Sequence, residues 1–272
     1  MFLISCRRGF SSNRRFALDA EVRRYDDVRR LDRYETLTPD GLAEAVRHRR
    51  VLVLVHGYRN PIREVTGAYR TVEEALRARG MLGVPGAYDE VLGFLWPGFE
   101  TVVGFVLAGP WANRSASFFR ALLRTLRPAA RAIDVQTHSL GARVALQALA
   151  FPHEVRVNAL LLTAPAVDNE CLEPGGEFHA SLASCRRAVV YHSSRDTVLR
   201  LSYRVGARDR ALGHKGPERP TVIARRVPNV VVVDCTAVVA EHGGYRRAPA
   251  YYAHWRRVLR PGPVLQFETL RP

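Results

Sequence analysis

The stretch DVQTHSLGARVAL, residues 134–146, predicts a strand that turns sharply into a helix. An apolar run of strand length, residues 132–136, precedes it, and the residues after Gly141 are good helix formers. Ser139 stands between the two, and Gly141 follows it by two places, as in the nucleophile elbow G-x-S-x-G. Thr137 stands where the first glycine of that motif is expected. A serine that only caps the start of a helix is the alternative interpretation.

Short apolar segments alternate with helical patterns along most of the chain. Six of these segments are rich in β-branched residues and uniformly apolar, which is typical of buried parallel strands. They are residues 51–55, 91–96, 132–136, 159–163, 188–191 and 229–233. Strands that alternate with helices connect through right-handed crossovers. The sequence therefore predicts an α/β fold in which helices flank a doubly wound, mostly parallel sheet.

Two helices show the expected apolar periodicity. Residues 62–76 carry an apolar side chain every three or four positions, and Gly80 is a candidate stop signal. A second apolar stripe covers residues 118–126, and Asn113 and Ser115 are its candidate N-terminal caps. We expect both helices to cover a face of the sheet.

The N-terminal 50 residues are less informative than the rest of the chain. Residues 2–5 are expected to add an edge strand, and residues 1–50 form an N-terminal arm around it. No internal repeat or low-complexity linker interrupts the sequence. With 272 residues, 47% of them hydrophobic, the chain suits one large core, so we expect a single domain over residues 1–272.

The formal net charge of +15 is the one unusual feature of the composition, and it raises the question of nucleic-acid binding. The distribution of the charge argues against that function. Of the 41 basic residues only Lys215 is a lysine, and the arginines occur as scattered doublets, often beside acids. No basic helical stripe or zinc-finger signature is present. A solvated surface is the favoured interpretation.

Cysteine spacing and hydropathy limit the other classes. The four cysteines, Cys6, Cys171, Cys185 and Cys235, lie far apart without a C-x-x-C pair, which argues for buried thiols rather than a metal site or a disulfide framework. No apolar stretch approaches the roughly 18 to 20 residues that cross a bilayer. The first residues place an apolar run before the arginines, the reverse of a signal peptide. We therefore expect a cytoplasmic protein without a transmembrane segment.

The chemistry is expected where the predicted strands end, because parallel sheets bind ligands at the carboxyl edge. Ser139 follows the third of the six strands, Asp196 the fifth, and His242 lies in the loop after the sixth. The order serine, acid, histidine is the one that α/β-hydrolases use. Asp168 also follows a strand and is the alternative acid.

Other candidates have plainer interpretations. His138 neighbours the serine and is expected to pack or to make a supporting hydrogen bond, since the elbow turns it away from the reaction. His254 lies on a predicted helix and is interpreted as a surface or packing residue. Asp234 is expected to cap a strand end.

Several quoted segments together resemble one family. VHGYRN, FLWPG, THSLGARVALQAL, TAPAVD, YHSSRDTVL and VVDC followed by HGGY are similar to the α/β-hydrolases catalogued as domain of unknown function 900, which are esterase- and lipase-like. The resemblance covers residues from about 51 to about 252. It implies an α/β-hydrolase fold with Ser139 as nucleophile, Asp196 as acid and His242 as base. Thr137 and Arg59 depart from the family pattern, in the elbow and beside the expected substrate contacts.

These residue types predict hydrolysis of a small-molecule carboxylic ester through an acyl-enzyme, with no metal and no organic cofactor. The backbone N–H groups of Leu140 and Tyr58 are the expected oxyanion donors. Trp96 and Phe99 are the expected substrate-binding wall. Two other functions remain open: a catalytically inactive binding protein with the same fold, and a basic nucleic-acid-binding protein.

A large lid is not expected. In many lipases a helical lid follows the strand after the elbow strand, whereas residues 163–188 are short, polar and rich in turn formers. The more apolar segment after Trp96 is expected to form one wall, with Phe105 and Trp111 near the ester. We therefore expect a solvent-reachable serine with a preference for short acyl chains.

Overall fold

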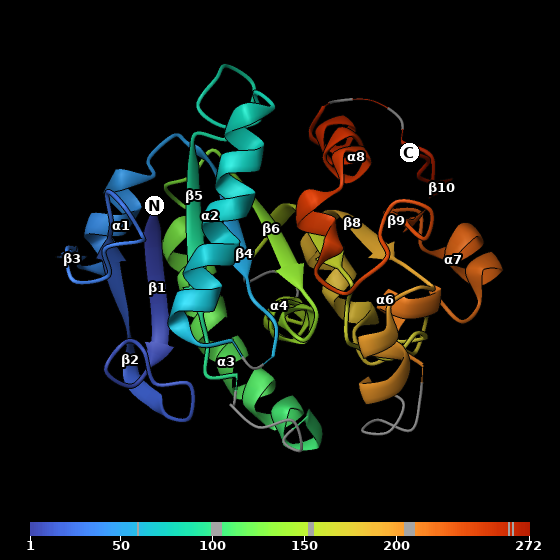
Figure 1. Cartoon of the computed structure of the whole chain (residues 1–272), viewed down its shortest axis with the longest axis horizontal. Coiled ribbons are helices and arrows are strands. Elements are labelled where there is room, and N and C mark those ends of the chain that lie inside the picture. The colour runs from blue at the N-terminus through green and yellow to red at the C-terminus, as the bar shows by residue number, and fades with distance from the viewer. Residues whose placement is uncertain (59, 99–104, 152–154, 204–209, 261, 263) are drawn as a thin grey trace.

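The computed structural model describes residues 1–58, 60–98, 105–151, 155–203, 210–260, 262 and 264–272. Within these residues the chain builds one ten-stranded sheet in the order β10-β9-β8-β7-β6-β4-β5-β1-β2-β3 (Figure 1). All neighbouring pairs from β10 to β1 are parallel, and only β2 and β3 are antiparallel to their neighbours. The strands are β1 (Phe2–Arg7), β2 (Phe16–Arg24), β3 (Glu35–Leu37), β4 (Arg50–Val55), β5 (Glu90–Leu95), β6 (Ala132–His138), β7 (Val157–Thr163), β8 (Cys185–His192), β9 (Val230–Asp234) and β10 (Phe267–Thr269).

Helices cover both faces of this sheet. Helices α1, α3 and α4 pack against one another on one face. Helices α2 and α8 lie on the other face, in front of the sheet in Figure 1, and the guanidinium of Arg79 after α2 lies over the ring of Tyr252 on α8. The larger helices are α1 (Pro39–Ala45), α2 (Ile62–Ala78), α3 (Phe105–Leu126), α4 (Gly141–Leu149), α7 (Pro220–Arg226) and α8 (Pro249–Leu259). The shorter ones are η2 (His179–Ser184), η3 (Leu199–Tyr203), α6 (Leu212–Lys215) and η4 (Gly244–Arg247).

The predicted fold class is confirmed: the sheet is doubly wound and mostly parallel. Its strand order reverses at β4, which has β5 on one side and β6 on the other. At such a switch point the loops leave in opposite directions and open a crevice at the carboxyl edge. The turn after β4 carries His56 and Gly57, and the turn after β6 carries Ser139. The topology thus places the serine in the crevice.

The expectation that residues 2–5 form an edge strand is wrong. Strand β1 is an inner strand, because it pairs with β5 on one side and with β2 on the other. Strands β2 and β3 extend the sheet beyond it. The residues of β1 are all buried, as an inner strand requires, whereas β2 is only partly buried.

The two predicted helices form, with one correction. Helix α2 buries Val65, Tyr69 and Leu76 and ends just before Gly80, whose φ is +61°. Helix α3 begins at Phe105, so Asn113 and Ser115 lie inside it and do not cap it. Instead, the Ser115 hydroxyl donates to the Trp111 carbonyl at 2.8 Å, one turn back along the helix.

The four cysteines are free and buried, as their spacing predicts. Burial raises the pKa of Cys6 and of Cys185 to about 12, so both thiols stay protonated and apolar at neutral pH. Among the helices of the described ranges, none has the length and apolar character that a bilayer span requires.

Candidate active site

Ser139 occupies a strained turn between β6 and α4. Its φ is +54°, a left-handed conformation that typically costs a non-glycine residue about 1 to 3 kcal/mol. Tertiary contacts hold it there: the Ser139 N–H donates to the Thr163 carbonyl at 3.0 Å, and its carbonyl accepts from the Ala166 N–H at 3.1 Å. This is the geometry of a nucleophile elbow, which a simple helix cap does not need.

Two glycines make room for this turn. A Cβ atom on Gly141 would lie 2.4 Å from the His56 carbonyl oxygen, so only glycine lets α4 approach the end of β4 so closely. A Cβ atom on Gly57 would lie 2.9 Å from the Cβ of Ser139. The glycine of the HGY segment therefore brings the β4 turn directly against the serine.

The elbow accommodates Thr137 without losing its shape. Thr137 is fully buried within β6 and pairs with Val55 on one side and Leu162 on the other. Its hydroxyl donates to the Leu161 carbonyl at 3.4 Å, so the polar group introduced here has an acceptor in the neighbouring strand.

His242 and Asp196 meet beside the elbow. The Nδ1 atom of His242 lies 2.7 Å from Oδ2 of Asp196, and the Asp196 side chain is only 1% exposed. The other carboxylate oxygen accepts from the Leu199 N–H at 2.9 Å. Because a carboxylate accepts, Nδ1 carries the proton and Nε2 is left as the basic nitrogen.

A buried serine links the two loops that carry these groups. The Ser193 hydroxyl donates to the Val239 carbonyl at 2.7 Å, and the Ser193 carbonyl accepts from the Asp196 N–H at 3.1 Å. Asp168, the alternative acid, lies elsewhere: it is half-buried and forms an isolated antiparallel bridge with Ala211. The geometry at His242 therefore favours Asp196 over Asp168.

Ser139 and His242 line the same pocket, whose volume is about 280 Å³. Helix α2 provides one wall, and the segment around η4 with the start of α8 provides another. The aliphatic and tyrosine side chains of the lining are Val55, Val65, Ala68, Val72, Tyr58, Tyr69, Tyr245 and Tyr251. Ser139 is only 6% exposed, so it is less open than expected and is reached through this pocket.

The expected oxyanion donors lie at the same place. Tyr58 lines the pocket directly after Gly57. Within the described part of the chain, the backbone N–H of Leu140 has no acceptor, although it directly follows Ser139. A free N–H at the start of α4 is suited to an anion, since it also lies at the positive end of the helix dipole.

His138 has a more specific place than its sequence position indicates. Its Nε2–H donates to the His242 carbonyl at 2.9 Å, and the two imidazole rings lie 4.6 Å apart. Burial, together with the charge that His242 carries when protonated, lowers the pKa of His138 to about 3. A neutral His138 therefore holds the backbone of the His242 loop, as the expected supporting hydrogen bond.

Trp96 does not line the pocket, which corrects the expectation of a substrate-binding role. It is fully buried, and its indole stacks on His56 with ring centroids 5.4 Å apart and Nε1–H donating to the His56 carbonyl at 2.8 Å. Through these two contacts with His56, Trp96 supports the turn after β4 without facing the pocket. The other expected wall residue, Phe99, lies outside the described residues.

Arg7, at the end of β1, is a member of this region that the sequence does not indicate. It is 1% exposed, and its Nη2 donates to Nε2 of His56 at 3.0 Å, while Nε donates to the Trp96 carbonyl at 2.9 Å. Burial lowers the pKa of Arg7 to about 10 and that of His56 well below its usual value. His56 is thus a neutral acceptor that supports the Gly57 turn.

The remaining candidates are structural. His254 is fully buried, so it packs rather than lying at the surface, and its Nδ1 is 2.9 Å from the Tyr191 hydroxyl. Asp234 ends β9 and accepts from the Thr236 N–H at 2.8 Å, as a capping residue does.

An α/β-hydrolase is defined by this strand order, by the strained turn at Ser139 and by side chains placed in the loops that follow the strands. Residues 39–254 match the family described as alpha/beta hydrolase of unknown function (DUF900). Since the match covers most of the chain, the protein belongs to this family. None of the curated proteins matches the sequence significantly.

Several solved structures are distantly similar. Esterase PE8 is 16% identical, with 74% of this chain and 87% of that chain covered and a TM-score of 0.47. The lin2722 gene product from Listeria innocua is 9% identical, with 82% and 98% covered and a TM-score of 0.49. LpqC, a poly(3-hydroxybutyrate) depolymerase from Bordetella parapertussis, is 14% identical, with 88% and 93% covered and a TM-score of 0.46. The family match therefore carries the assignment.

Proposed function

We propose that the protein is a serine hydrolase that cleaves carboxylic esters, with Ser139 as nucleophile, His242 as base and Asp196 as the acid that orients it. One observation carries the proposal. Ser139 stands on a strained elbow and lines the same pocket as His242, whose Nδ1 is bound by the buried Asp196. Strain of this kind persists where the surrounding structure enforces it, and it gathers at functional sites.

The proposed acylation follows from these positions. As Ser139 Oγ attacks the ester carbonyl carbon, Nε2 of His242 takes the hydroxyl proton and Asp196 stabilises the resulting imidazolium. The carbonyl oxygen becomes an oxyanion, which the N–H groups of Leu140 and Tyr58 stabilise. When the carbon–oxygen bond to the leaving group breaks, Nε2 returns the proton to the departing alkoxide, and the acyl group stays on Ser139.

Deacylation repeats these steps with water. His242 takes a proton from the water as its oxygen attacks the acyl carbon, and Ser139 Oγ leaves and regains the proton. Loss of one oxyanion donor typically costs about 3 to 4 kcal/mol of transition-state stabilisation. The start of α4 supports the same charge through its dipole.

The pocket favours a small substrate. Its volume of about 280 Å³ is just below the range of about 300 to 1,000 Å³ that small-molecule sites occupy. Val65, Ala68 and Val72 of α2 give it an apolar wall. A short acyl chain is therefore the proposed preference.

The test is labelling with a fluorophosphonate probe combined with hydrolysis of p-nitrophenyl esters and thioesters. We expect the probe to label Ser139, and Ser139→Ala to lose both labelling and hydrolysis. Ser194→Ala is the matched control, since Ser194 is exposed and, among the described residues, its hydroxyl bonds only to Thr236 on the neighbouring loop. Labelling of another serine would contradict the assignment, and a folded protein without labelling or turnover would be an inactive binding protein.

A further inference from the structure

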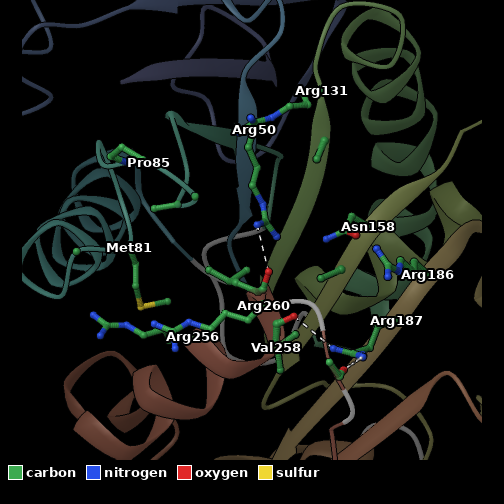
Figure 2. A pocket seen from close by; sticks show the side chains of 17 residues that line it. Arg50, Met81, Pro85, Arg131, Asn158, Arg186, Arg187, Arg256, Val258 and Arg260 are labelled. Atoms are coloured by element: carbon green, nitrogen blue, oxygen red, sulfur yellow. Dashed lines mark hydrogen bonds between the residues drawn. The ribbon is translucent and has the colours of Figure 1, made fainter.

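A second cavity, of about 610 Å³, lies at the opposite edge of the sheet from Ser139 (Figure 2). The starts of β4, β6, β7 and β8 form its floor, and the loop after α2 and the end of α8 form its walls. Strands of six or seven residues rise about 3.3 Å per residue, so the two edges are about 20 Å apart. The cavity is therefore separate from the proposed active site.

Arginine dominates the lining of this cavity, which we call the arginine pocket. Figure 2 shows the guanidinium groups reaching it from several elements. The six arginines are Arg50, Arg131, Arg186, Arg187, Arg256 and Arg260. Among the described residues that line the pocket, none is an aspartate or glutamate. A concave site with one sign of charge attracts ligands of the opposite sign.

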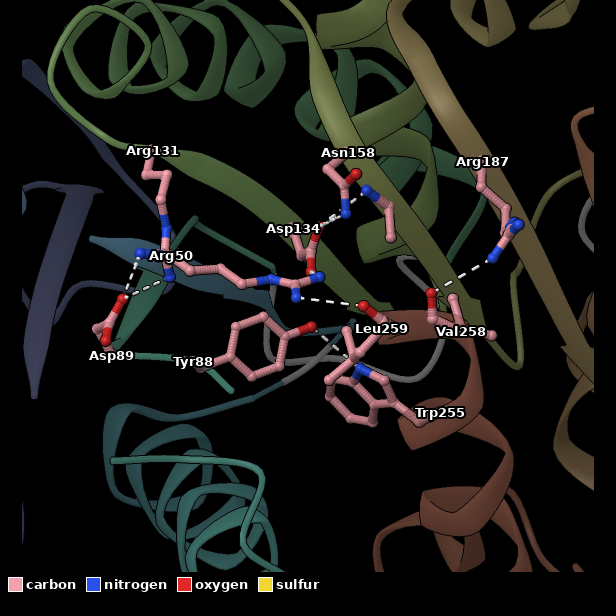
Figure 3. A network of polar contacts seen from close by, with 11 residues as sticks. Arg50, Tyr88, Asp89, Arg131, Asp134, Asn158, Arg187, Trp255, Val258 and Leu259 are labelled. Carbon is pink, nitrogen blue, oxygen red and sulfur yellow. Dashed lines mark hydrogen bonds and ion pairs between the residues drawn. The ribbon is translucent and has the colours of Figure 1, made fainter. Parts of the chain in front are cut away.

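Two of the six arginines have carboxylate partners outside the lining (Figure 3). Nη2 of Arg50 lies 2.9 Å from Oδ2 of the fully buried Asp134, and Nη2 of Arg131 lies 3.4 Å from Oδ2 of Asp89. The other oxygen of Asp134 accepts from the Asn158 side chain and from a backbone N–H. These carboxylates are thus already engaged by the fold and cannot balance the other four arginines.

Two of the six arginines donate to the carbonyls at the C-terminal end of α8. Nη1 of Arg187 donates to the Val258 carbonyl at 3.3 Å, and Nη1 of Arg50 donates to the Leu259 carbonyl at 3.3 Å, at the negative end of α8. Burial lowers the pKa of Arg187, and the positive charge of the neighbouring Arg186 lowers it further.

Capping does not account for the other three. In the part of the chain that the structure describes, the side chains of Arg186, Arg256 and Arg260 make no hydrogen bond or ion pair, and Arg186 and Arg260 are exposed. Three guanidinium groups without such a partner therefore surround one cavity, next to three that already serve the fold, and like charges gather there. An anion bound between them would relieve the repulsion between these charges and use their free N–H donors.

We propose that the arginine pocket binds a small organic polyphosphate, of the nucleoside triphosphate class. The planar guanidinium fork matches phosphate oxygens bidentately, and several forks suit more than one phosphate. The volume exceeds what a single inorganic ion needs and falls in the range of about 300 to 1,000 Å³ for small-molecule sites. Pro85 and the partly exposed Leu259 supply an apolar side for the uncharged part of the ligand.

Isothermal titration calorimetry with ATP and with inorganic triphosphate tests the proposal. We expect one site per chain, and at least tenfold weaker binding in Arg186→Ala/Arg256→Ala. The matched control is Arg8→Ala/Arg15→Ala, which removes two exposed arginines from the β1–β2 hairpin, where β1 ends at the other edge of the sheet. Equal losses in the two double variants would show attraction to the overall surface charge and overturn the proposal.

Two further measurements separate a built site from charge alone. Arg186→Lys/Arg256→Lys keeps the charge but not the fork, so we expect clearly weaker binding than in the wild type, and unchanged binding would contradict a phosphate fork. Adenosine, without phosphates, should not bind. Tighter binding to phosphatidylserine vesicles or to a single-stranded DNA oligonucleotide than to ATP would overturn the small-molecule assignment. Ser139→Ala should bind ATP like the wild type, which keeps this test independent of the proposed hydrolase activity.

Discussion

Oδ2 of Asp196 lies 2.7 Å from Nδ1 of His242, although 46 residues separate the two in the sequence. The contact joins the turn after β8 to the loop after β9, and it fixes which imidazole nitrogen carries the proton. A carboxylate that is 1% exposed and bonded through both oxygens is held by the fold in this one role.

The first prediction concerns that carboxylate. Asp196→Asn keeps the size of the side chain but favours the wrong tautomer of His242, so we expect turnover to fall by about 10³- to 10⁴-fold. Asp168→Asn is the control and should stay near the wild-type rate. Steady-state ester hydrolysis measures both, and equal losses would count against Asp196 as the acid.

The second prediction concerns His138 as a positioning residue. His138→Phe keeps the ring contact with His242 and removes the N–H that its carbonyl accepts. A lost hydrogen bond of about 1 kcal/mol corresponds to roughly a fivefold fall in kcat, with KM little changed. His138→Gln, whose amide can replace Nε2–H, should restore part of the rate. A wild-type kcat in the phenylalanine variant would show that the bond positions nothing.

The third prediction separates two glycines by the space around them. A methyl group on Gly141 would meet backbone carbonyls of the β4 turn, so Gly141→Ala should destabilise the fold by about 3 kcal/mol or more. A methyl group on Gly67, within α2, would meet no described atom within 4 Å beyond its chain neighbours and its own helix backbone, so Gly67→Ala should stabilise the fold by up to about 1 kcal/mol. Urea unfolding of both variants decides this, and a neutral Gly141→Ala would mean that α4 does not pack this closely.

The fourth prediction is a loss of stability in mild acid. Burial lowers the pKa of His254 to about 4, against about 6.5 in an unfolded chain. Below pH 6.5 the unfolded chain therefore binds a proton there that the folded chain does not, and stability falls with pH. At pH 5 this amounts to roughly 2 kcal/mol.

The matched variant for this test is His254→Asn, in which the side-chain amide can still reach the Tyr191 hydroxyl. It should be less stable at pH 8 but should lose less of its stability between pH 8 and pH 5. Denaturant unfolding at the two pH values measures the difference. The same loss in variant and wild type would show that His254 is not the group that titrates.

The fifth prediction concerns the missing large lid. Between β7 and β8 the only helix among the described residues is the short η2, so no long apolar helix covers the serine from this interval. The rate with a longer-chain ester should therefore rise smoothly across its critical micelle concentration, and short acyl chains should be preferred. A sharp rise at that concentration would reveal a cover.

The fold could be predicted where buried strands have a simple, uniformly apolar sequence. Each predicted strand overlaps an observed one, because inner parallel strands are apolar on both faces. Strand β8 begins three residues earlier than predicted, since Cys185, Arg186 and Arg187 resemble a loop in sequence although they already belong to the strand. Strand β2 escapes prediction because its partly exposed residues include charges. The single-domain expectation stays a prediction.

The candidate triad could be located because the ends of parallel strands meet at one edge, so that chain order alone groups Ser139, Asp196 and His242. The supporting residues could not. Arg7 reaches His56 from a strand 49 residues away, and nothing in an apolar strand that ends in an arginine indicates a buried guanidinium. Trp96 is fully buried, yet a tryptophan after a strand has the same local sequence whether it faces a ligand or the core.

Helix α8 touches both cavities, with Tyr251 near its start lining the serine pocket and Val258 near its end lining the arginine pocket. Eleven helical residues span about 16 Å, so the helix covers most of the distance of about 20 Å between the two edges of the sheet. Arg50 and Arg187, which donate to the Leu259 and Val258 carbonyls at its end, are the same groups that would face the proposed polyphosphate. A ligand that drew these two arginines away would loosen the C-terminal end of α8. If this changed the affinity of the serine pocket for an acyl ligand by some factor, thermodynamic linkage requires the acyl ligand to change the affinity of the arginine pocket by the same factor.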